Sequence, residues 1–478
     1  MSRQNLRAKA FFPGGRRSRP ARLLATAALA TLAGITLPHP AAHAVTPSVP
    51  CSVPDLVEAI KAANSTPGAD TIRLAHKCTY KLVAPDPAHP ANGLPVITSE
   101  ITIDGNGATI TRAASAPDFR ILLVDKTGNL TLNKATISGG RATDCPLFPG
   151  EAVCGGGINN QGTLTVNHSR IVHNSADTAR DGFFVEGGGI DSDGPATVND
   201  TEISHNTAVF SGTTQTSADG GGIANDGPLT LNHTRVTDNT VGVPENTDSF
   251  AFGAGVAPFA EAEIEHSTIS RNHASAPGGT ALGAVTTGNP VPGETTTLEV
   301  TDSVIAENTT SAPGGLAVGG GLATGFPVSL TRTRVIDNTA TAPGGTARGG
   351  GIHISRTGGL TLTGSTVRGN TARASGGTAR GGGISNAAGG TLTADQSHFT
   401  RNTAEAPDGG TAQGGGIFHA VGTTTLKNKS SVTGNTATDG DGGGIFKESG
   451  TLTLDDTVVR RNRPNNCAPA GSVPGCTG

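Results

Sequence analysis

Aromatic side chains are scarce in this sequence. Trp is absent, Tyr occurs once, and aromatic residues make up 3% of the 478 positions. Sugar-binding sites commonly use the apolar face of an aromatic ring as a platform. The composition therefore argues against a site that recognises sugars by ring stacking.

An excess of either charge is also lacking. Lys and Arg number 34, Asp and Glu number 38, and the formal net charge is −4. No basic stripe with interleaved aromatic residues occurs, so we expect no nucleic-acid partner and no attraction to anionic membranes. After residue 37 no apolar run reaches the roughly 20 residues of a membrane span. We expect no membrane span once a leader is removed, and a monomer.

The first 44 residues have the pattern of an export signal. A basic segment is followed by an uncharged apolar run over residues 23–37 and by Ala42, His43 and Ala44, which fit a cleavage site. The adjacent Arg16 and Arg17 leave open whether export uses the general or the twin-arginine route. We expect a secreted protein that is extracellular or loosely associated with the cell surface.

The six cysteines fall into three pairs that are close in the sequence. An even number of cysteines in an exported chain is typical of disulfides, and the spacings match no zinc-binding pattern. Each pair brackets one loop or one end of the fold, so we predict local bonds and no metal site. The predicted pairs are Cys51–Cys78, Cys145–Cys154 and Cys467–Cys476.

Glycine is abundant, and its 70 occurrences are periodic. A glycine-rich step such as Gly155-Gly156-Gly157 leads into an aliphatic residue about every 32 residues, which indicates stacked repeats rather than disorder. These aliphatic positions are Ile158, Ile190, Ile223, Val256, Val285, Leu322, Ile352, Ile384, Ile417 and Ile445.

An asparagine closes every repeat, with Ser or Thr five residues before it and an apolar residue three before it. Asn tolerates the left-handed backbone of a tight turn, and stacked amides can hydrogen-bond to one another. We predict an internal structural ladder rather than a row of binding groups. Its members are Asn174, Asn206, Asn239, Asn272, Asn308, Asn338, Asn370, Asn402, Asn435 and Asn462.

Alternating segments such as Thr163-Leu164-Thr165-Val166 lie between the two markers. They predict strands with one buried face, and no segment after residue 65 has the period of a helix. Three such strands per repeat cannot bury a core alone, so neighbouring repeats must stack. The predicted fold is all-β, a right-handed parallel β-helix of ten repeats with a spacing of about 4.8 Å.

The segment after each Asn is rich in Pro and Gly. We expect it to form loose loops that leave one corner of the solenoid and present its binding surface. Six phenylalanines in the loops of repeats two to four favour a binding patch there, namely Phe183, Phe184, Phe210, Phe250, Phe252 and Phe259.

Residues 51–69 differ from the repeats. Ser52 is placed to cap a helix over residues 54–64 with Asp55 as the reciprocal partner, and Leu56, Val57 and Ile60 would form its apolar face. Such a helix would cover the open end of the core. The expected organisation is a signal peptide (1–44), an N-terminal cap (45–83), irregular first coils (84–154), a ten-repeat β-helix (155–462) and a disulfide-closed C-terminal cap (463–478).

The cap resembles a known N-terminal motif. The similar residues are Cys51-Ser52, Leu56, Glu58-Ala59-Ile60, Ala62-Ala63-Asn64 and Asp70-Thr71-Ile72, and the motif is named for its sequence Cys-Ser-Leu-Arg-Glu-Ala-Ile. Three extra residues follow Ser52 here, and Val57 replaces the Arg. The Gly-Gly-Gly-Ile and Ile-x-x-Asn markers resemble the repeats of polymorphic outer-membrane proteins. The resemblance covers residues 51–478, implies a pectin-lyase-like β-helix on a secreted or surface protein, and transfers no catalytic motif.

Cleavage of a polysaccharide is the main alternative, since this fold hosts lyases and hydrolases. Such enzymes need clustered carboxylates for acid–base work or for Ca²⁺, which would be the one expected cofactor. The candidates at equivalent places of neighbouring repeats are Glu186 with Asp219, Asp193 with Asp226, and the adjacent Asp191. Asp is also common in glycine-rich turns, so the composition favours a structural role.

An outward column that is mostly Thr is similar to the surface of ice-binding solenoids, but Thr is also a good residue for any exposed strand. Glu263 and Glu299 interrupt the column, which runs from Thr165 to Thr453. We therefore expect a non-enzymatic extracellular solenoid, adhesin-like or structural, that contacts cell-surface or matrix glycans or proteins. A polysaccharide lyase or glycoside hydrolase is the alternative, and ice binding is the third possibility.

Overall fold

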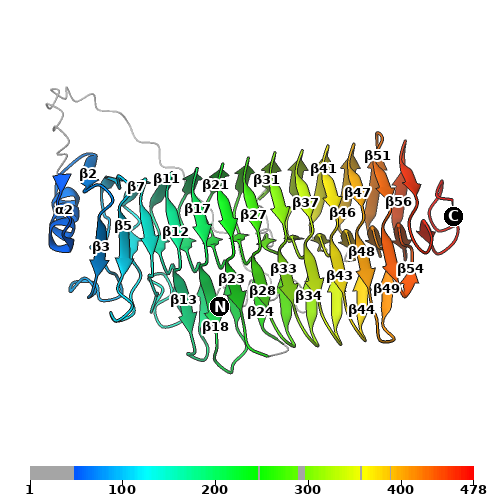
Figure 1. Cartoon of the computed structure of the whole chain (residues 1–478), viewed down its shortest axis with the longest axis horizontal. Helices are drawn as coiled ribbons and strands as arrows, with labels where there is room; N and C mark the ends of the chain where they lie inside the picture. The colour runs from blue at the N-terminus through cyan, green and yellow to red at the C-terminus, as the bar shows by residue number, and fades with distance from the viewer. Residues whose placement is uncertain (1–47, 246–247, 289–295, 356–357, 388, 478) are drawn as a thin grey trace, which may run out of the picture.

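The computed structural model describes residues 48–245, 248–288, 296–355, 358–387 and 389–477. The predicted signal peptide lies outside these residues. Within them the chain is almost entirely β, with one helix, α2 (Val53–Ser65), at the N-terminal end (Figure 1). Neighbouring strands of the stacked sheets run parallel. The predicted all-β parallel β-helix with a short N-terminal helix is confirmed.

One coil contains five short strands, each of which pairs with its equivalent in the next coil. In the first of the ten repeats the strands are β10 (Ile158–Asn160), β11 (Thr163–Asn167), β12 (Arg170–Val172), β13 (Ser175–Thr178) and β14 (Phe184–Glu186). We number the sheets that contain them I to V; they have 12, 14, 13, 9 and 10 strands in the described residues. The expectation of three strands per repeat is therefore wrong.

Sheets I, II and III enclose the main hydrophobic core. Their inward side chains stack in three columns of mostly aliphatic residues, which are buried except in the last coil, where Leu454 and Val459 are half-buried. Each such aliphatic side chain contributes about 1.5–3 kcal/mol to the hydrophobic driving force. The first pairs of the columns are Ile158 with Ile190, Val166 with Val198, and Ile171 with Ile203.

Sheets IV and V form a thin fin with a separate core, which lies at the bottom of Figure 1. Alanines fill most of this core, as Ala340, Ala347 and Ala372 illustrate. The fin edge is ordered as well, because the N–H of Gly344 donates a 2.8 Å hydrogen bond to the carbonyl of Ser375 in the next coil. The expectation of loose loops is wrong, because Thr-Ala-Thr segments alternate with a period of two and place only a small apolar side chain inward.

Between the main core and the fin, the two sides of each coil approach closely at a narrow junction, which we call the pinch. Glycine and asparagine residues form it. A Cβ atom on Gly156 would lie 2.3 Å from the carbonyl oxygen of Ser175, where β13 begins. A Cβ atom on Gly157 would lie 2.9 Å from the side-chain nitrogen of Asn174. The glycine-rich step is therefore required sterically, since no other residue lets the two backbones approach so closely.

The ten asparagines form one continuous column of amides at this pinch. The backbone N–H and the side-chain nitrogen of Asn308 both donate to the side-chain oxygen of Asn338, over 3.0 and 2.9 Å. The side-chain nitrogen also donates to the carbonyl of Ile269 over 3.0 Å. The same three bonds recur from the start of the column to its end. Because each amide bonds to the next, the column holds the coils in register.

A second ladder joins most of the Ser and Thr residues that lie five positions before an Asn, a role that was not predicted for them. The N–H of Thr333 donates to the hydroxyl of Ser365 over 3.1 Å, and this hydroxyl donates to the carbonyl of Leu330 over 3.0 Å. Both hydroxyl side chains are buried. The spacing of the two markers thus reflects two parallel columns of buried hydrogen bonds.

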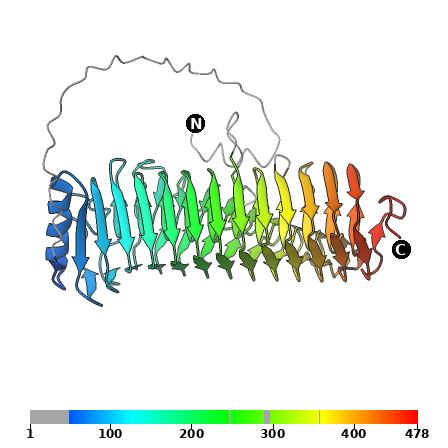
Figure 2. The ribbon, with the colours of Figure 1, turned by 90° about the horizontal axis from the view of Figure 1, so that it is seen from above.

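Helix α2 lies across the N-terminal end of the solenoid (Figure 2). The strands of sheet II lie side by side along the length of the solenoid. The helix buries Leu56 and Ile60 against the core, whereas Val57 is only half-buried. Ser52 occupies the N-cap position but makes no side-chain cap hydrogen bond, so the predicted reciprocal cap with Asp55 is wrong. Pro54, at the second helical position, has no N–H group. One of the donors that could bond to a capping side chain is therefore missing.

Three disulfides close local loops. The pairs are those that the spacing predicts, Cys51–Cys78, Cys145–Cys154 and Cys467–Cys476. Among the described residues no helix has the length and apolar character that crossing a bilayer requires.

Candidate functional site

A crease runs along the solenoid where sheet V turns into sheet I. In each coil the last residue of the sheet V strand and one residue of the sheet I strand lie on either side of the glycine-rich step, outside the main core and the core of the fin, and most of these side chains are buried. From the N-terminal end, these pairs are Cys154 with Asn159, Glu186 with Asp191, Asp219 with Ala224, Phe252 with Ala257, Leu282 with Thr286, Val318 with Ala323, Arg348 with His353, Arg380 with Ser385, Gln413 with Phe418, and Asp441 with Phe446.

Three of the five candidate carboxylates lie at one end of this crease. Glu186 and Asp219 are register partners in β14 and β19 (Ser217–Asp219), so their Cα atoms are about one strand spacing, 4.8 Å, apart. Asp191 faces Glu186, and its carboxylate accepts a 2.8 Å hydrogen bond from the side-chain amide of Asn159. The structure thus gathers these three acidic groups, and whether they act catalytically stays a prediction.

The other two candidates, Asp193 and Asp226, lie in the turn between sheets I and II. Their backbone N–H groups donate to the carbonyls of Asn160 and Ser192, over 2.8 and 2.7 Å. Both residues are half-buried. This place matches the turn role that their glycine-rich surroundings predict, and it separates them from the pairs that face each other across the crease.

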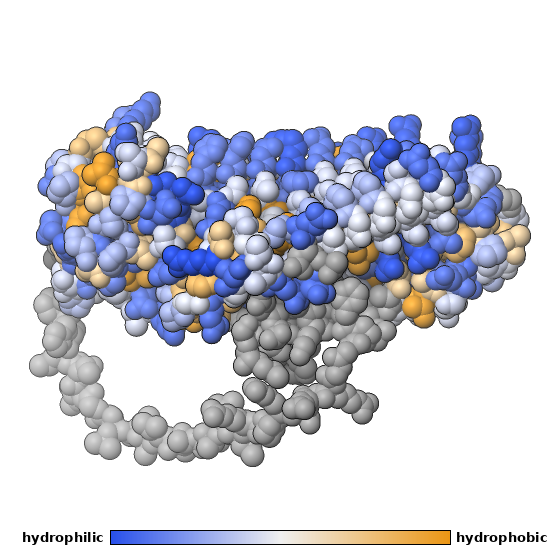
Figure 3. All heavy atoms as spheres, turned by 90° about the horizontal axis from the view of Figure 1, so that it is seen from below, coloured by the Kyte–Doolittle hydropathy of each residue, from blue (hydrophilic) through white to orange (hydrophobic). Residues whose placement is uncertain are grey.

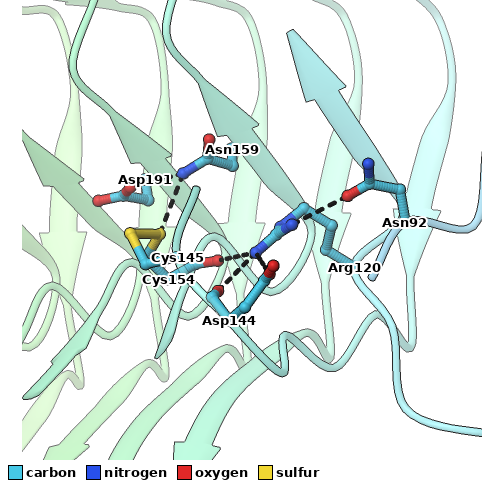
Figure 4. Close-up of a disulfide and its surroundings, with 7 residues drawn as sticks. All are labelled: Asn92, Arg120, Asp144, Cys145, Cys154, Asn159 and Asp191. Atoms are coloured by element: carbon cyan, nitrogen blue, oxygen red, sulfur yellow. Dashed lines mark hydrogen bonds and ion pairs between the residues drawn. A yellow bond between two sulfur atoms is a disulfide. The ribbon is translucent and has the colours of Figure 1, made fainter. Parts of the chain in front are cut away.

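A disulfide and a buried arginine close the acidic end of the crease (Figure 4). The Arg120 side chain is 1% exposed and pairs with the carboxylate of Asp144 at 2.5 Å. It also donates to the Asn92 side chain and to the Cys154 carbonyl, over 2.9 and 3.3 Å. Because Cys154 is bonded to its disulfide partner, its sulfur is no metal ligand, although both sulfurs and an Asp191 oxygen lie within 4.8 Å of one another.

An apolar cluster forms the middle of the crease and is separate from both cores. It contains Phe250, Phe252, Leu282, Val318 and Ala323. The remaining phenylalanines of this region do not join it. Phe210 lies in the core of the fin, and Phe184 packs beside the second disulfide. The expected patch of six phenylalanines on loops is therefore wrong, because four of them belong to strands and face three different environments.

Cationic side chains follow the apolar cluster and form what we call the cationic end of the crease, although Gln413 and Asp441 continue the same column beyond them. Arg348 faces His353, and the Arg380 guanidinium lies 4.8 Å from the ring centre of Phe418. Burial, and secondarily the charge of Arg348, lowers the pKa of His353 to about 3, so this imidazole is neutral at physiological pH. Burial also lowers the pKa of Arg348. Three buried polar atoms here have no hydrogen-bond partner among the described residues: Arg348 Nε, His353 Nδ1 and Ser385 Oγ.

The acidic end was predicted from the sequence, and the cationic end was not. The two arginines could have been found from their place in the repeat. Arg348 and Arg380 directly precede their glycine-rich steps, as Glu186 does. The same position in successive repeats changes from acidic to apolar to basic residues and then to Gln413 and Asp441.

The Thr column lies on the outer face of sheet II and is longer than predicted. It begins at Thr71, Thr102 and Thr131 in the first coils and continues in register into Thr165. The face it forms is flat and hydroxyl-rich. The column is interrupted by Glu263 and Glu299, which occupy equivalent positions in two neighbouring strands.

No protein-family model, curated protein or solved structure matches this chain. Its function must therefore be inferred from the crease and from the rest of the surface.

Proposed function

We propose that this chain is an extracellular, non-enzymatic scaffold whose crease binds an extended segment of a partner protein. The observation that carries the proposal is the order of side chains along the crease, in which carboxylates are followed by an apolar cluster and then by two guanidinium groups, before Gln413 and Asp441 complete the column. A polypeptide can present cationic, apolar and anionic side chains in one line. The backbone of a regular polysaccharide repeats the same groups, so it does not complement such a gradient.

The dimensions suit a short peptide. Glu186 and Arg348 are separated by five coil steps, which amounts to about 24 Å at the strand spacing. An extended chain covers this distance with about seven residues. Such segments bind through alternate side chains that enter pockets, while a rigid scaffold keeps those pockets at fixed distances. The stacked hydrogen-bond ladders give the solenoid this rigidity.

The unpartnered polar atoms support binding at the cationic end. Arg348 Nε, His353 Nδ1 and Ser385 Oγ are buried without hydrogen bonds, and such groups carry a desolvation cost of about 1–3 kcal/mol each. A carboxylate of a bound segment would supply acceptors for the two donors among them.

An extracellular location fits the three disulfides, since disulfides persist in oxidising compartments. It also fits the leader pattern of residues 1–44. The cap residues from Cys51 to Ile72 and the Ile-x-x-Asn repeats support a relation to the polymorphic outer-membrane repeat proteins. On this proposal the protein acts as a monomer at the cell surface or in the matrix.

The test uses residues 45–478 and a fluorescent peptide of about seven residues that runs from Lys through Leu and Phe to Glu. The scrambled peptide of equal composition is the matched control. Anisotropy titrations should show tighter binding of the ordered peptide, and the substitutions Arg348→Ala and Arg380→Ala together should weaken it by about tenfold, as expected for lost charge-assisted hydrogen bonds.

A control variant with the same change of charge is Arg235→Ala combined with Arg334→Ala, which alters exposed side chains on sheet III. Its affinity for the ordered peptide should equal that of the parent. Equal binding of the ordered and scrambled peptides, or equal losses in the two double variants, would show that the crease does not select this ligand.

Polysaccharide cleavage is the second candidate, and the register pairing of Glu186 with Asp219 favours it. Two carboxylates at neighbouring positions could serve as acid and base. Ice binding has less support, because Glu263 and Glu299 place charges in the middle of the otherwise hydroxyl-rich column.

A further inference from the structure

A pocket of about 400 Å³ lies near the C-terminal end, at the corner between sheets III and IV. This corner is on the other side of the fin from the crease. Four arginines from three coils converge on it: Arg368, Arg401, Arg460 and Arg461. The volume is within the range of about 300–1,000 Å³ that small-ligand sites occupy.

The four guanidinium groups have no ion pair and no side-chain hydrogen bond within the described part of the chain. Other arginines along the solenoid do have an acidic partner in the adjacent coil. Arg271 pairs with Asp238 at 2.8 Å, and Arg332 pairs with Asp302 at 2.6 Å. The last coils therefore gather like charges, whereas Arg271 and Arg332 each lie beside a carboxylate, and such a cluster attracts anions.

Two stacked columns shape the pocket. In sheet III the register partners are Arg368, Thr400, Thr433 and Arg460 in successive coils, so two half-buried threonines lie between two arginines. In the adjacent turn, Gly434 separates Arg401 from Arg461, and a Cβ atom at this glycine would meet nothing within 4 Å. The missing side chain leaves the space that the guanidinium groups surround.

We propose that this pocket binds the carboxylate or sulfate groups of an acidic polysaccharide. Guanidinium groups form bidentate, charge-assisted hydrogen bonds with such oxyanions, and the two threonine hydroxyls can bond to sugar hydroxyls. Arg401 and Arg461 are two coils apart, about 9.6 Å, so together they can contact charged groups on successive units of one chain.

The pocket lining disfavours nucleic acid as the ligand. No aromatic ring lines it, whereas proteins that bind single strands stack the bases on aromatic side chains. The part of the face of the fin that is coloured in Figure 3 is largely hydrophilic, with small apolar patches scattered along it. Charge and hydroxyl contacts are thus the means of recognition here, and this site is independent of the crease.

The test is calorimetric titration of residues 45–478 with heparin, polygalacturonate, dextran and an oligothymidylate. At least one of the two acidic polysaccharides should bind at least about tenfold more tightly than dextran or the oligonucleotide, and added salt should weaken this binding. Tighter binding of heparin identifies sulfate as the preferred group, and tighter binding of polygalacturonate identifies carboxylate.

Variants then locate the site. Arg401→Ala combined with Arg461→Ala should reduce the affinity about tenfold, while the control Arg235→Ala with Arg334→Ala should leave it unchanged. Gly434→Asp should also abolish binding, because it places a carboxylate in the pocket; Asp238 and Asp337 already adopt this left-handed conformation at the same corner of other coils. Urea denaturation checks that each variant is folded.

Three results would overturn the proposal. They are equal binding of dextran and both acidic polysaccharides, an oligonucleotide affinity equal to theirs, and a loss of binding in the control double variant that matches the loss in the pocket variant.

Discussion

The side-chain nitrogen of Asn338 donates a 2.9 Å hydrogen bond to the side-chain oxygen of Asn370 in the next coil. That oxygen also accepts the backbone N–H of Asn338 over 3.0 Å. Since Asn338 in turn accepts two bonds from Asn308, its amide is engaged on both sides and is fully buried. The repeat marker is thus a continuous structural column rather than a series of ligand contacts.

We predict that Asn338→Ala lowers the free energy of unfolding by about 1–3 kcal/mol, because it leaves buried hydrogen-bonding groups unpaired. Asn338→Asp should cost more, because it buries a charge in the same column. The control Thr361→Ala alters an exposed side chain on sheet II and should be nearly neutral. Urea denaturation of the three variants and the parent gives the values, and a stability of Asn338→Ala equal to that of the parent would contradict the ladder.

Deleting residues 51–69 should make the protein aggregate. The deletion removes α2, whose Leu56 and Ile60 pack against the core, and it leaves β2 (Asp70–Leu74) with only the two residues of β1 (Ser48–Val49) to cover its edge. An uncovered apolar end and an unpaired strand edge both favour association between copies. Size-exclusion chromatography distinguishes the outcomes, and a truncated protein that elutes as a monodisperse monomer would refute the capping role.

Acidification should destabilise the parent through His353. Its pKa falls from 6.5 to about 3 on folding because the ring is buried. Between these two pH values the unfolded state binds more protons, so this residue reduces stability by about 1.4 kcal/mol for each unit that the pH decreases. The contribution is absent above pH 6.5, where both states are neutral.

The matched variant is His353→Ser, because Ser385 occupies the equivalent place in the next coil. Urea denaturation at about pH 7 and about pH 4.5 should show a smaller loss of stability in the variant than in the parent. Equal losses in the two proteins would mean that the His353 ring is solvated in the folded state.

The fin should be as sensitive to overpacking as an ordinary core. Ala372 is fully buried between sheets IV and V, so Ala372→Leu should destabilise the protein by about 1–3 kcal/mol. The neighbouring Arg373 is exposed, and Arg373→Leu provides a control on the outer surface of the same strand. Thermal denaturation that found both variants equally stable would indicate that the fin has no packed core.

The sequence predicted the main core correctly, because large aliphatic residues such as Ile158 and Val166 recur at a period that only stacked strands explain. It did not reveal the fin, since Ala340 and Ala372 bury little area and their Pro- and Gly-rich neighbours are typical of loops. The crease was missed for another reason. Glu186 and Arg348 differ in charge, and they belong to one column only because every coil places the same position at the same corner.

A binding scaffold must leave its ligand unchanged, whereas an enzyme at the acidic end of the crease would cleave it. The most direct measurement is the release of reducing or unsaturated sugar ends when residues 45–478 are incubated with polygalacturonate, heparin and other polysaccharides, with and without Ca²⁺. We predict no release above that of the protein-free control. Release that disappears in the variant combining Glu186→Gln with Asp219→Asn would contradict the scaffold function and identify the chain as a polysaccharide-cleaving enzyme.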